Sequence, residues 1–396
     1  MISSCLYYIS GISWVYRQKF PVIQTRKYGF VAYSPQTTCL SYVILNEMKD
    51  LVKRKIIGIL IFALFIRLLS LFLFKNINNY DLESYQLVGN LTRNFINIYP
   101  SPANIRYPYL PFYLYLEAIG SVIFLKTLNI AFDLGILYLV YLISKRNLKT
   151  AFLYAVNPVT ILISTLHGQF DVIPLFFLIL SFYLLTKKKE TAAVLSFSLS
   201  VLTKTWPLMF IFILLKSLKN KRLIFLTFVF PAVGILAYSY FFKATPFSII
   251  KTVAGYQGLS GIWGFGYLFR SKIFIFVFLV ILFIYSYFLK GKNLIKKSYR
   301  FLVVFFFTTL GFSVQYLGWF VPFLILEKRS KSIWLLVSMS AYIISLYSFW
   351  VFFPNSVIVP WWLISMQNIL GTALWLDFGI YWYISTKSSC RNSINL

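Results

Sequence analysis

Carboxylates are scarce in this chain, so each one can be considered in turn for acid–base chemistry. The ten acids are Glu47, Asp50, Asp81, Glu83, Glu117, Asp133, Asp171, Glu190, Glu327 and Asp377. Asp81 and Glu83 share the polar stretch NINNYDLESY, which directly follows the first long apolar run. An aspartate placed there can act as a general base that takes a proton from an attacking hydroxyl group. The alternative is an ordinary polar cap, because loops and helix ends often carry aspartate.

The other acids fall into two groups. Glu47, Asp50, Glu190 and Glu327 lie beside lysines, where a solvated charge is the ordinary interpretation. Asp133 and Asp377 lie inside apolar runs. A charge in the middle of a membrane costs about 2.5–3.5 kcal/mol, so each of these two needs a partner or a polar cavity. Structural pairing and function are both open for them.

A second polar cluster, His167-Gly-Gln-Phe-Asp171, lies between two apolar segments. It contains the single histidine of the chain, together with Gln169 and Asp171. A lone histidine at a helix end is commonly an interface residue. Three polar side chains within five positions favour a functional tip instead. Asn157-Pro158, which precedes His167 in the same apolar segment, is expected to kink that helix.

Two cations also stand out. Lys204 lies at the tip of a short hairpin, where an unpartnered charge is improbable, so a phosphate or an acid is expected to neutralise it. Arg106 lies in the first outer loop. A lysine or arginine that faces a phosphate stabilises the charge that develops on a leaving oxygen.

The elements that position these residues are expected to be membrane helices. Hydrophobic residues make up 59% of the chain and charged residues 12%, and apolar runs recur at spanning length. The runs lack the alternation of a membrane β-barrel. The net charge of +28 comes from short Lys and Arg clusters between the runs, which is typical of cytoplasmic anchoring and argues against a nucleic-acid partner. The three cysteines show neither metal-ligand spacing nor a disulfide framework.

The positive clusters also predict the topology. We expect residues 1–47 to be a weakly ordered extension or a start-site artefact, and 48–396 to form a single domain. The first span is Ile56–Phe74, the first outer loop is 75–126, and Phe112–Leu125 is an interfacial or re-entrant helix. Five hairpins follow, over 151–186, 191–218, 223–289, 301–327 and 332–386. This organisation predicts an all-α polytopic membrane protein with about 10–12 transmembrane helices.

With every basic cluster on the cytoplasmic side, every hairpin tip faces outward. The hairpins 191–218 and 301–327 have arms too short to cross a bilayer, which favours a cavity that opens outward. The loop 243–272 combines glycines with aromatic residues, a composition suited to a flap over a site. A plain aromatic belt at the membrane interface is the alternative.

The order of the motifs resembles that of a known superfamily. An acid after the first span precedes Arg106-Tyr107-Pro108, and then come Asp133, Asn157-Pro158, the 167–171 tip, Lys204-Thr-Trp-Pro207 and Gln315-Tyr-Leu-Gly-Trp319. This resembles the GT-C superfamily of integral membrane glycosyltransferases, and within it the first mannosyltransferase of GPI-anchor synthesis and its prokaryotic relatives. The resemblance covers about residues 50–330. The acid motif of the superfamily is Asp-x-Asp, whereas here it is Asp81-Leu82-Glu83.

The resemblance implies a GT-C-like bundle with a loop-built active site and an inverting transfer of a hexose, often mannose, from a dolichyl or other polyprenyl phosphate. Asp81 would be the catalytic base. Glu83, Arg106, Tyr107, His167, Gln169, Asp171, Lys204, Gln315 and Trp319 would bind substrate. Among these, Arg106 and Lys204 would hold the phosphate, and His167, Gln169 and Asp171 would position sugar hydroxyls or the donor phosphate. The relatives need no nucleotide and some need no metal, so a divalent metal stays open.

The implied partners are a polyprenyl-phosphate sugar donor, a glycan or glycolipid acceptor, and the bilayer. The expected location is the cell membrane with the active site on the outer face, or the endoplasmic reticulum membrane in a eukaryote. A lipid-linked sugar flippase or transporter is the main alternative, because intramembrane charges can mark a path. Transporters commonly show inverted repeats, and we find none in the sequence. A non-enzymatic assembly factor is a third interpretation.

Overall fold

The computed structural model describes residues 35–255, 263–269, 271–291, 293–327, 332–353 and 358–394. This part of the chain contains helices and no strand. The chain divides into two compact units, Met1–Val52 and Lys53–Leu396. In the first unit the described residues belong to the beginning of helix α2, Pro35–Leu73. Of the expected N-terminal extension, residues 1–34 lie outside the described residues.

The second unit continues from α2 through a series of mostly short helices. Its first half contains α3 (Tyr80–Arg93), η3 (Pro102–Ile105), α4 (Phe112–Ile119), α5 (Val122–Ile143), α6 (Leu148–Ala155), α7 (Pro158–Leu162), the π-helix η4 (Ile163–His167), α8 (Val172–Thr186) and α9 (Glu190–Thr203). Its second half contains η5 (Trp206–Phe210), α10 (Ile211–Leu215), η6 (Lys221–Phe228), α11 (Val229–Phe242), α12 (Pro246–Ala254), η7 (Gly264–Tyr267), α13 (Lys272–Phe288), α14 (Leu294–Thr308), α15 (Tyr316–Glu327), α16 (Ser332–Phe352) and α17 (Trp361–Ile394).

Four helical stretches within the described residues are long and apolar enough to cross a membrane: Arg54–Leu73, Val122–Ile143, Lys221–Phe242 and Ile333–Phe352. The count rises to five if the bent pair Leu148–Ala155 and Pro158–His167 forms one span. Several other apolar helices are only 10–17 residues long, including both α9 and α15 of the predicted short hairpins. These findings agree with an all-α protein of the membrane class, and a count of 10–12 crossings stays a prediction.

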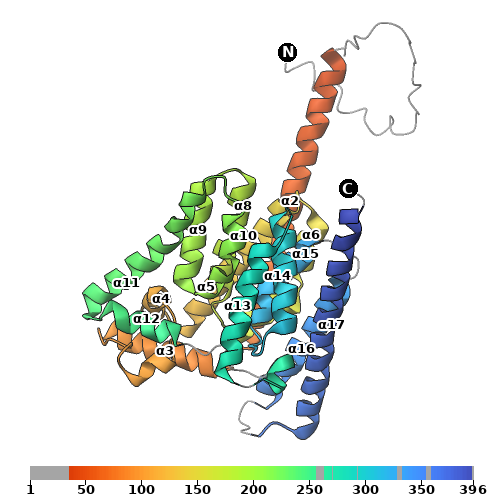
Figure 1. The fold of residues 1–396 in the computed structure, drawn as a ribbon. Coiled ribbons are helices and arrows are strands. Elements are labelled where there is room, and N and C mark those ends of the chain that lie inside the picture. The colour runs from red at the N-terminus through yellow and green to blue at the C-terminus, as the bar shows by residue number, and fades with distance from the viewer. Residues whose placement is uncertain are drawn as a thin grey trace. The chain divides into compact units, whose positions relative to one another are not determined.

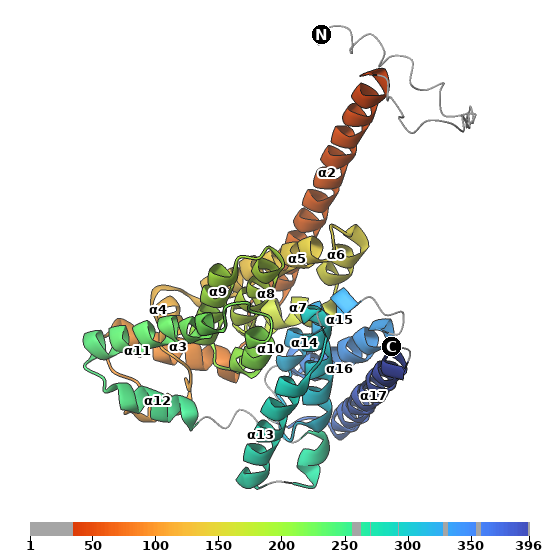
Figure 2. The ribbon, with the colours of Figure 1, turned by 45° about the horizontal axis from the view of Figure 1, so that its top comes forward.

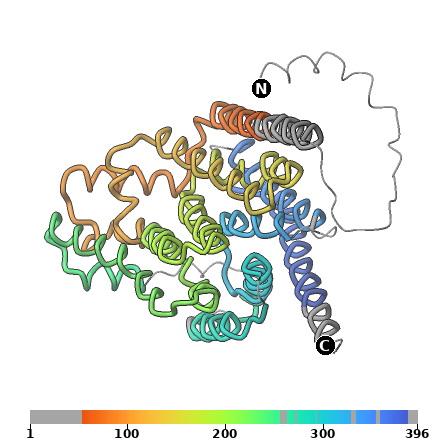
Figure 3. Tube along the Cα trace, turned by 90° about the horizontal axis from the view of Figure 1, so that it is seen from above, coloured from red at the N-terminus to blue at the C-terminus, as the bar shows by residue number. Residues whose placement is uncertain are grey.

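Helices that follow one another in the chain pack side by side. Figure 1 shows α8 beside α9 and α16 beside α17. In Figure 2, α11 lies beside α3 and α4, where Tyr238 of α11 packs edge-on against Tyr99 at 5.1 Å. Figure 3 shows the second half of α2 next to α5. Two of the predicted tips coincide with breaks between helices, at 168–171 before α8 and at 204–205 before η5. Most of the predicted tip at 315–319 instead lies in the first turn of α15.

The first outer segment is more helical than the sequence suggested. The stretch expected as a polar loop contains α3, with Asp81 and Glu83 in its first turn. Phe112–Leu125, expected as one helix, is two elements: α4 ends at Ile119, and the side chain of Ser121 caps α5 by accepting a hydrogen bond from the backbone N–H of Phe124. A serine cap thus starts α5 at Val122, so the last five residues of the predicted loop 75–126 are helical.

The helix that leads to the 167–171 tip is broken, as the Asn157-Pro158 pair predicted. Asn157 Oδ1 accepts hydrogen bonds from the backbone N–H groups of Val159 and Thr160, and the two helical pieces meet at 46°. A π-helical turn follows, and Gly168 ends it in the left-handed region at φ 75°. That conformation favours glycine, and it turns the chain sharply before α8.

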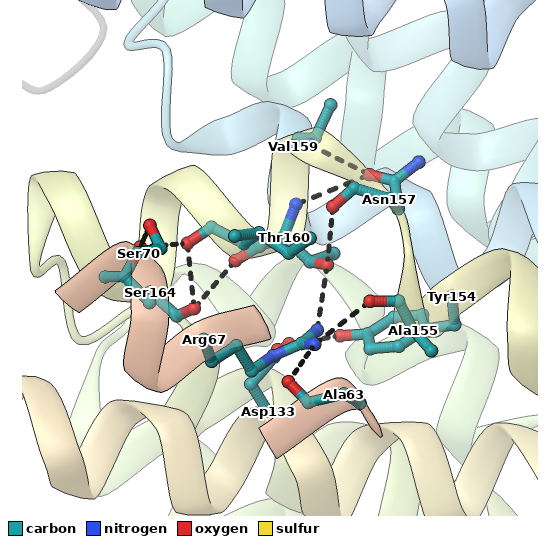
Figure 4. Close-up of polar contacts among 12 residues, drawn as sticks. Ala63, Arg67, Ser70, Asp133, Tyr154, Ala155, Asn157, Val159, Thr160 and Ser164 are labelled. Carbon is teal, nitrogen blue, oxygen red and sulfur yellow. Dashed lines mark hydrogen bonds and ion pairs between the residues drawn. The ribbon is translucent and has the colours of Figure 1, made fainter. Parts of the chain in front are cut away.

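A buried ion pair joins α2, α5 and the broken helix. Arg67 Nε donates to Asp133 Oδ2 at 2.5 Å, and Tyr154 Oη donates to Asp133 Oδ1 at 2.6 Å (Figure 4). The guanidinium also donates to the carbonyl oxygens of Ala63 and Ala155, at 3.1 and 3.0 Å. All of its charge is therefore satisfied inside an apolar bundle, as a buried pair requires. The sequence predicted that Asp133 needs a partner and left Arg67 unnoticed.

The ion pair generates a stability prediction. Arg67→Met leaves Asp133 charged, buried and unpaired, and we expect it to lower the unfolding free energy by about 3–5 kcal/mol. The double variant Arg67→Met with Asp133→Leu removes both charges and should be more stable than Arg67→Met alone. Unfolding of the purified protein in detergent measures both effects, with the exposed Lys75→Met as control. A double variant as unstable as the single one would contradict this role for the pair.

Candidate active site

Asp81 is positioned by the cap of helix α3. Asn79 Oδ1 accepts hydrogen bonds from the backbone N–H groups of Asp81 and Leu82 at 3.1 and 3.0 Å, which starts the helix. Asn79 Nδ2 donates to the backbone oxygen of His167 at 3.0 Å. One buried asparagine therefore fixes the first turn of α3 against the end of the broken helix.

The carboxylate of Asp81 is held through one oxygen. His167 Nε2 lies 2.8 Å from Asp81 Oδ2, and Gln169 Nε2 donates to the same oxygen. The side chain of Asp81 is 32% exposed, and no residue in the described part of the chain bonds to Oδ1. Two donors thus fix the orientation of the carboxylate, and its second oxygen stays available to accept a proton.

Two tyrosines fix the groups that hold Asp81. Tyr347 Oη lies 2.6 Å from His167 Nδ1, and the imidazole packs edge-on against Trp350 at 5.2 Å. When Tyr347 donates to Nδ1, the Nε2–H of a neutral His167 donates to Asp81. Tyr85 Oη donates to Gln169 Oε1 at 2.8 Å, which turns the NH₂ group of the amide toward Asp81. His167 and Gln169, the two residues that bond to Asp81, are therefore each held in orientation by a hydrogen bond to a tyrosine.

The surroundings keep Asp81 ionised. Burial is the largest single influence and raises the pKa of Asp81. The hydrogen bonds from His167 and Gln169, together with the electrostatic attraction of His167 and Lys204, outweigh this effect and lower the pKa of Asp81 below the ordinary value of 3.8. At neutral pH Asp81 is a carboxylate that can accept hydrogen bonds and cannot donate one.

Asp171, at the end of the 167–171 tip, forms a second buried ion pair. Lys204 Nζ donates to Asp171 Oδ2 at 2.6 Å, and Trp319 Nε1 donates to Asp171 Oδ1 at 2.8 Å. The ammonium group also lies 4.6 Å from the ring centres of both Tyr109 and Phe170. Of the two partners predicted for Lys204, a phosphate or an acid, the structure supplies the acid.

A small cavity links this centre to the Arg67 pair. It has a volume of about 20 Å³ and is lined by Asp171, Gln315 and Trp319 on one side and by Asp133, Tyr154 and Thr160 on the other. A space of this size holds at most a single water molecule, and most of its wall is apolar. Gln315 thus lines the cavity beside Asp171 and is not one of the residues that bond to Asp81.

Three predicted residues lie outside the Asp81 contacts. Glu83 is exposed and accepts a hydrogen bond from Asn78 at 3.1 Å. Arg106 donates to Ser84 Oγ at 3.2 Å and stacks on Tyr80 at 4.0 Å. Tyr107 is buried and donates to a backbone oxygen at 2.9 Å, which is a structural contact. Of the predicted aromatic flap, residues 256–262 and 270 lie outside the described residues.

Sequence reasoning missed several supporting residues. Tyr85 follows Asp81 by four positions, so helical spacing could have placed both on one face. Lys126, Asn129 and Asp133 follow one another at spacings of three and four along α5, which marks a polar stripe on its buried face. Tyr347 lies in an apolar run and gives no signal of its own.

Glu117 is a further buried acid near this region. It is 3% exposed, and neither of its carboxyl oxygens has a hydrogen-bond partner among the described residues. Its charge would raise the pKa values of Tyr99, Tyr107 and Tyr113, so these rings lie around it. Burial raises the pKa of Glu117 well above 4.5, so the folded protein holds this proton to a higher pH than the unfolded chain does.

Neither a metal-binding cluster nor a comparison with known proteins assigns a function to this site. Among the described residues, no three His, Cys, Asp or Glu side chains gather so that they could hold a metal ion. A comparison of the chain with family models, with curated proteins and with solved structures finds no match. The geometry of the site therefore carries the functional interpretation.

The buried state of Glu117 predicts a pH effect on stability. The folded protein keeps a proton that the unfolded chain releases above pH 4.5, so stability falls as pH rises from 4.5 toward the raised pKa. Glu117→Gln keeps the neutral shape and removes this dependence, with a slope difference of about 1.4 kcal/mol per pH unit within that window. Unfolding midpoints in detergent across pH measure it, with exposed Glu83→Gln as control. Parallel pH curves for wild type and Glu117→Gln would contradict a buried neutral acid.

Proposed function

We propose that this protein is an integral membrane glycosyltransferase that moves a hexose, with mannose as the first candidate, from a polyprenyl phosphate to a glycan or glycolipid acceptor. One observation carries the proposal: Asp81 is an ionised carboxylate with one oxygen fixed by two donors and the other unoccupied by any described residue. This is the arrangement that a general base for a hydroxyl nucleophile requires. The motif order that resembles the GT-C superfamily supplies the substrate class.

In the proposed reaction, Asp81 Oδ1 accepts the proton of the acceptor hydroxyl. The hydroxyl oxygen forms a bond to the anomeric carbon, and the bond between that carbon and the phosphate oxygen breaks. The phosphate leaves with the bonding electron pair, and the configuration at carbon inverts. Because its pKa is lowered, Asp81 is a weak base toward a free hydroxyl. Proton transfer becomes favourable only as the new carbon–oxygen bond makes the hydroxyl acidic, so the two events are coupled.

The residues around Asp81 act in this proposal as positioning residues. Both ring nitrogens of His167 have protein partners, and the amide of Gln169 bonds through its oxygen and its nitrogen. Asp171 uses both carboxyl oxygens on Lys204 and Trp319. We therefore propose that His167 and Gln169 orient the base, whereas sequence reasoning alone assigned them to sugar or phosphate binding.

Arg106 is the better placed of the two predicted phosphate ligands. Its side chain is partly exposed, it makes one hydrogen bond to Ser84, and it forms no ion pair with an acid among the described residues. A guanidinium has five N–H donors, so several remain for a phosphate. Lys204, by contrast, already has Asp171 as its counter-charge.

Loss of the base should abolish transfer. Asp81→Asn keeps the shape and removes the proton acceptor, and we expect the transfer rate to fall at least about 100-fold. The assay is transfer from radiolabelled polyprenyl-phosphate mannose in proteoliposomes of purified protein. Glu83→Gln is the matched control and should retain activity within about threefold, because an exposed carboxylate lies outside the Asp81 contacts.

Two outcomes would overturn the proposal. Full transfer activity in Asp81→Asn would exclude the base assignment. Movement of the labelled donor across the bilayer with no glycosylated product would favour a flippase instead.

A further inference from the structure

Lys126 is a buried cation that has no counter-charge among the residues that the structure describes. It lies on α5, one turn from the start of that helix, and is 1% exposed. Its Nζ has no hydrogen-bond partner among the described residues. The other buried cations differ: Arg67 pairs with Asp133, Lys204 pairs with Asp171, and Lys297 donates to Ser217. A buried ammonium group with no partner is costly, so an anion that reaches it would be strongly stabilised.

The stem of Lys126 lies against the turn that carries the site. A Cβ placed on Gly168 would be 3.1 Å from Lys126 Cε and 2.8 Å from Leu82 Cδ2. Gly168 separates His167 from Gln169, the two residues that hold Asp81, and Leu82 follows Asp81 directly. Lys126 therefore packs beside the backbone that positions the proposed base.

A second unpartnered polar atom lies on the same face of α5. Asn129, three residues after Lys126, donates through Nδ2 to the backbone oxygen of Gly168 at 2.9 Å. Its Oδ1 is buried and has no donor from any described residue. The pair offers one cationic donor and one neutral acceptor on a single helix face. A ligand that carries an anionic oxygen and a hydroxyl group, such as the phosphate ester of a sugar, matches both.

The ammonium group can meet such a ligand without a change of fold. Lysine has a flexible four-carbon stem and swings its charge toward a polar interface. Because Lys126 lies only one turn inside α5, its Nζ can reach the end of the helix, where the backbone N–H groups also favour an anion.

We propose that Lys126 binds the phosphate of the polyprenyl-phosphate donor beside Gly168, with Asn129 Oδ1 accepting a hydroxyl of the attached sugar. The assignment rests on the proposed glycosyl transfer for the identity of the ligand. It adds a phosphate ligand to those that the sequence motifs predicted. It also gives a role to the polar stripe of α5.

The test uses purified full-length protein in nanodiscs, with polyprenyl phosphate as the charged probe and the matching polyprenol as the neutral probe. Lys126→Met removes the charge at similar volume, and we expect at least tenfold weaker binding of polyprenyl phosphate with unchanged binding of polyprenol. Lys126→Arg keeps a charge and should bind polyprenyl phosphate within about threefold of wild type. Lys297→Met, which removes another buried lysine, should leave both affinities unchanged.

Stability separates a ligand-binding role from a structural one. An unpartnered buried charge destabilises the ligand-free protein, so Lys126→Met should unfold at the same or a higher temperature than wild type, and polyprenyl phosphate should raise its midpoint less. A Lys126→Met variant that unfolds earlier or fails to fold would overturn the proposal, because Lys126 would then have a structural partner. Equal affinity of wild type and Lys126→Met for polyprenyl phosphate would overturn it as well.

Failure of this inference is distinguishable from failure of the proposed function. If Asp81→Asn abolishes transfer and Lys126→Met binds polyprenyl phosphate normally, the transferase assignment stands and Lys126 has no phosphate role. If Lys126→Met loses binding and wild type transfers no sugar, the anion site stands and the glycosyltransferase assignment fails. If the protein is a glycosyltransferase and Lys126 binds the donor phosphate, Lys126→Met should raise the KM for the donor at least tenfold and change kcat less.

Discussion

Every charge inside an apolar helical bundle needs a partner, and this constraint organises the whole second unit. Arg67 and Asp133 join α2 to α5, and Asp171 and Lys204 join the 167–171 tip to the end of α9. Asp81 receives two donors from the same tip. The ionic contacts thus connect the elements that surround the site, and they fix how those elements rotate. Helix packing alone would leave such rotations free over many degrees.

The geometry of α3 explains why Asp81 contacts the buried tip while Glu83 is exposed. Both lie in the first turn of α3, where an acid is favoured by the helix dipole. They are two positions apart, so they project to different sides of the helix. Asp81 shares its side with Tyr85 and faces the buried tip, whereas Glu83 faces solvent beside Asn78. The preference for Asp81 follows from this geometry, which the Asp-Leu-Glu sequence by itself cannot reveal.

Local patterns predicted the local elements well. Asn157-Pro158 predicted the bend, the tips at 167–171 and at Lys204 marked helix breaks, and the cost of an unpartnered Lys204 predicted an acid or phosphate beside it. Which acid it would be could not be predicted, because a partner 33 positions away depends on how α8 and α9 pack. The helical character of α3 was missed because its polar residues resemble those of a loop. Only tertiary contacts single out Tyr347, since a tyrosine in an apolar run is ordinary core.

Two of the buried ionisable groups without a hydrogen-bond partner among the described residues, Glu117 and Lys126, have opposite consequences. Glu117 can become neutral by keeping its proton, so it needs no ligand. Lys126 can lower its cost by gaining an anion, and a phosphate that enters beside Gly168 would supply one. In the proposed transfer, the charge on that phosphate would increase as the bond to the anomeric carbon breaks. An ammonium group beside the phosphate would stabilise this transition state more than the bound donor, and would so lower the barrier as well as strengthen binding.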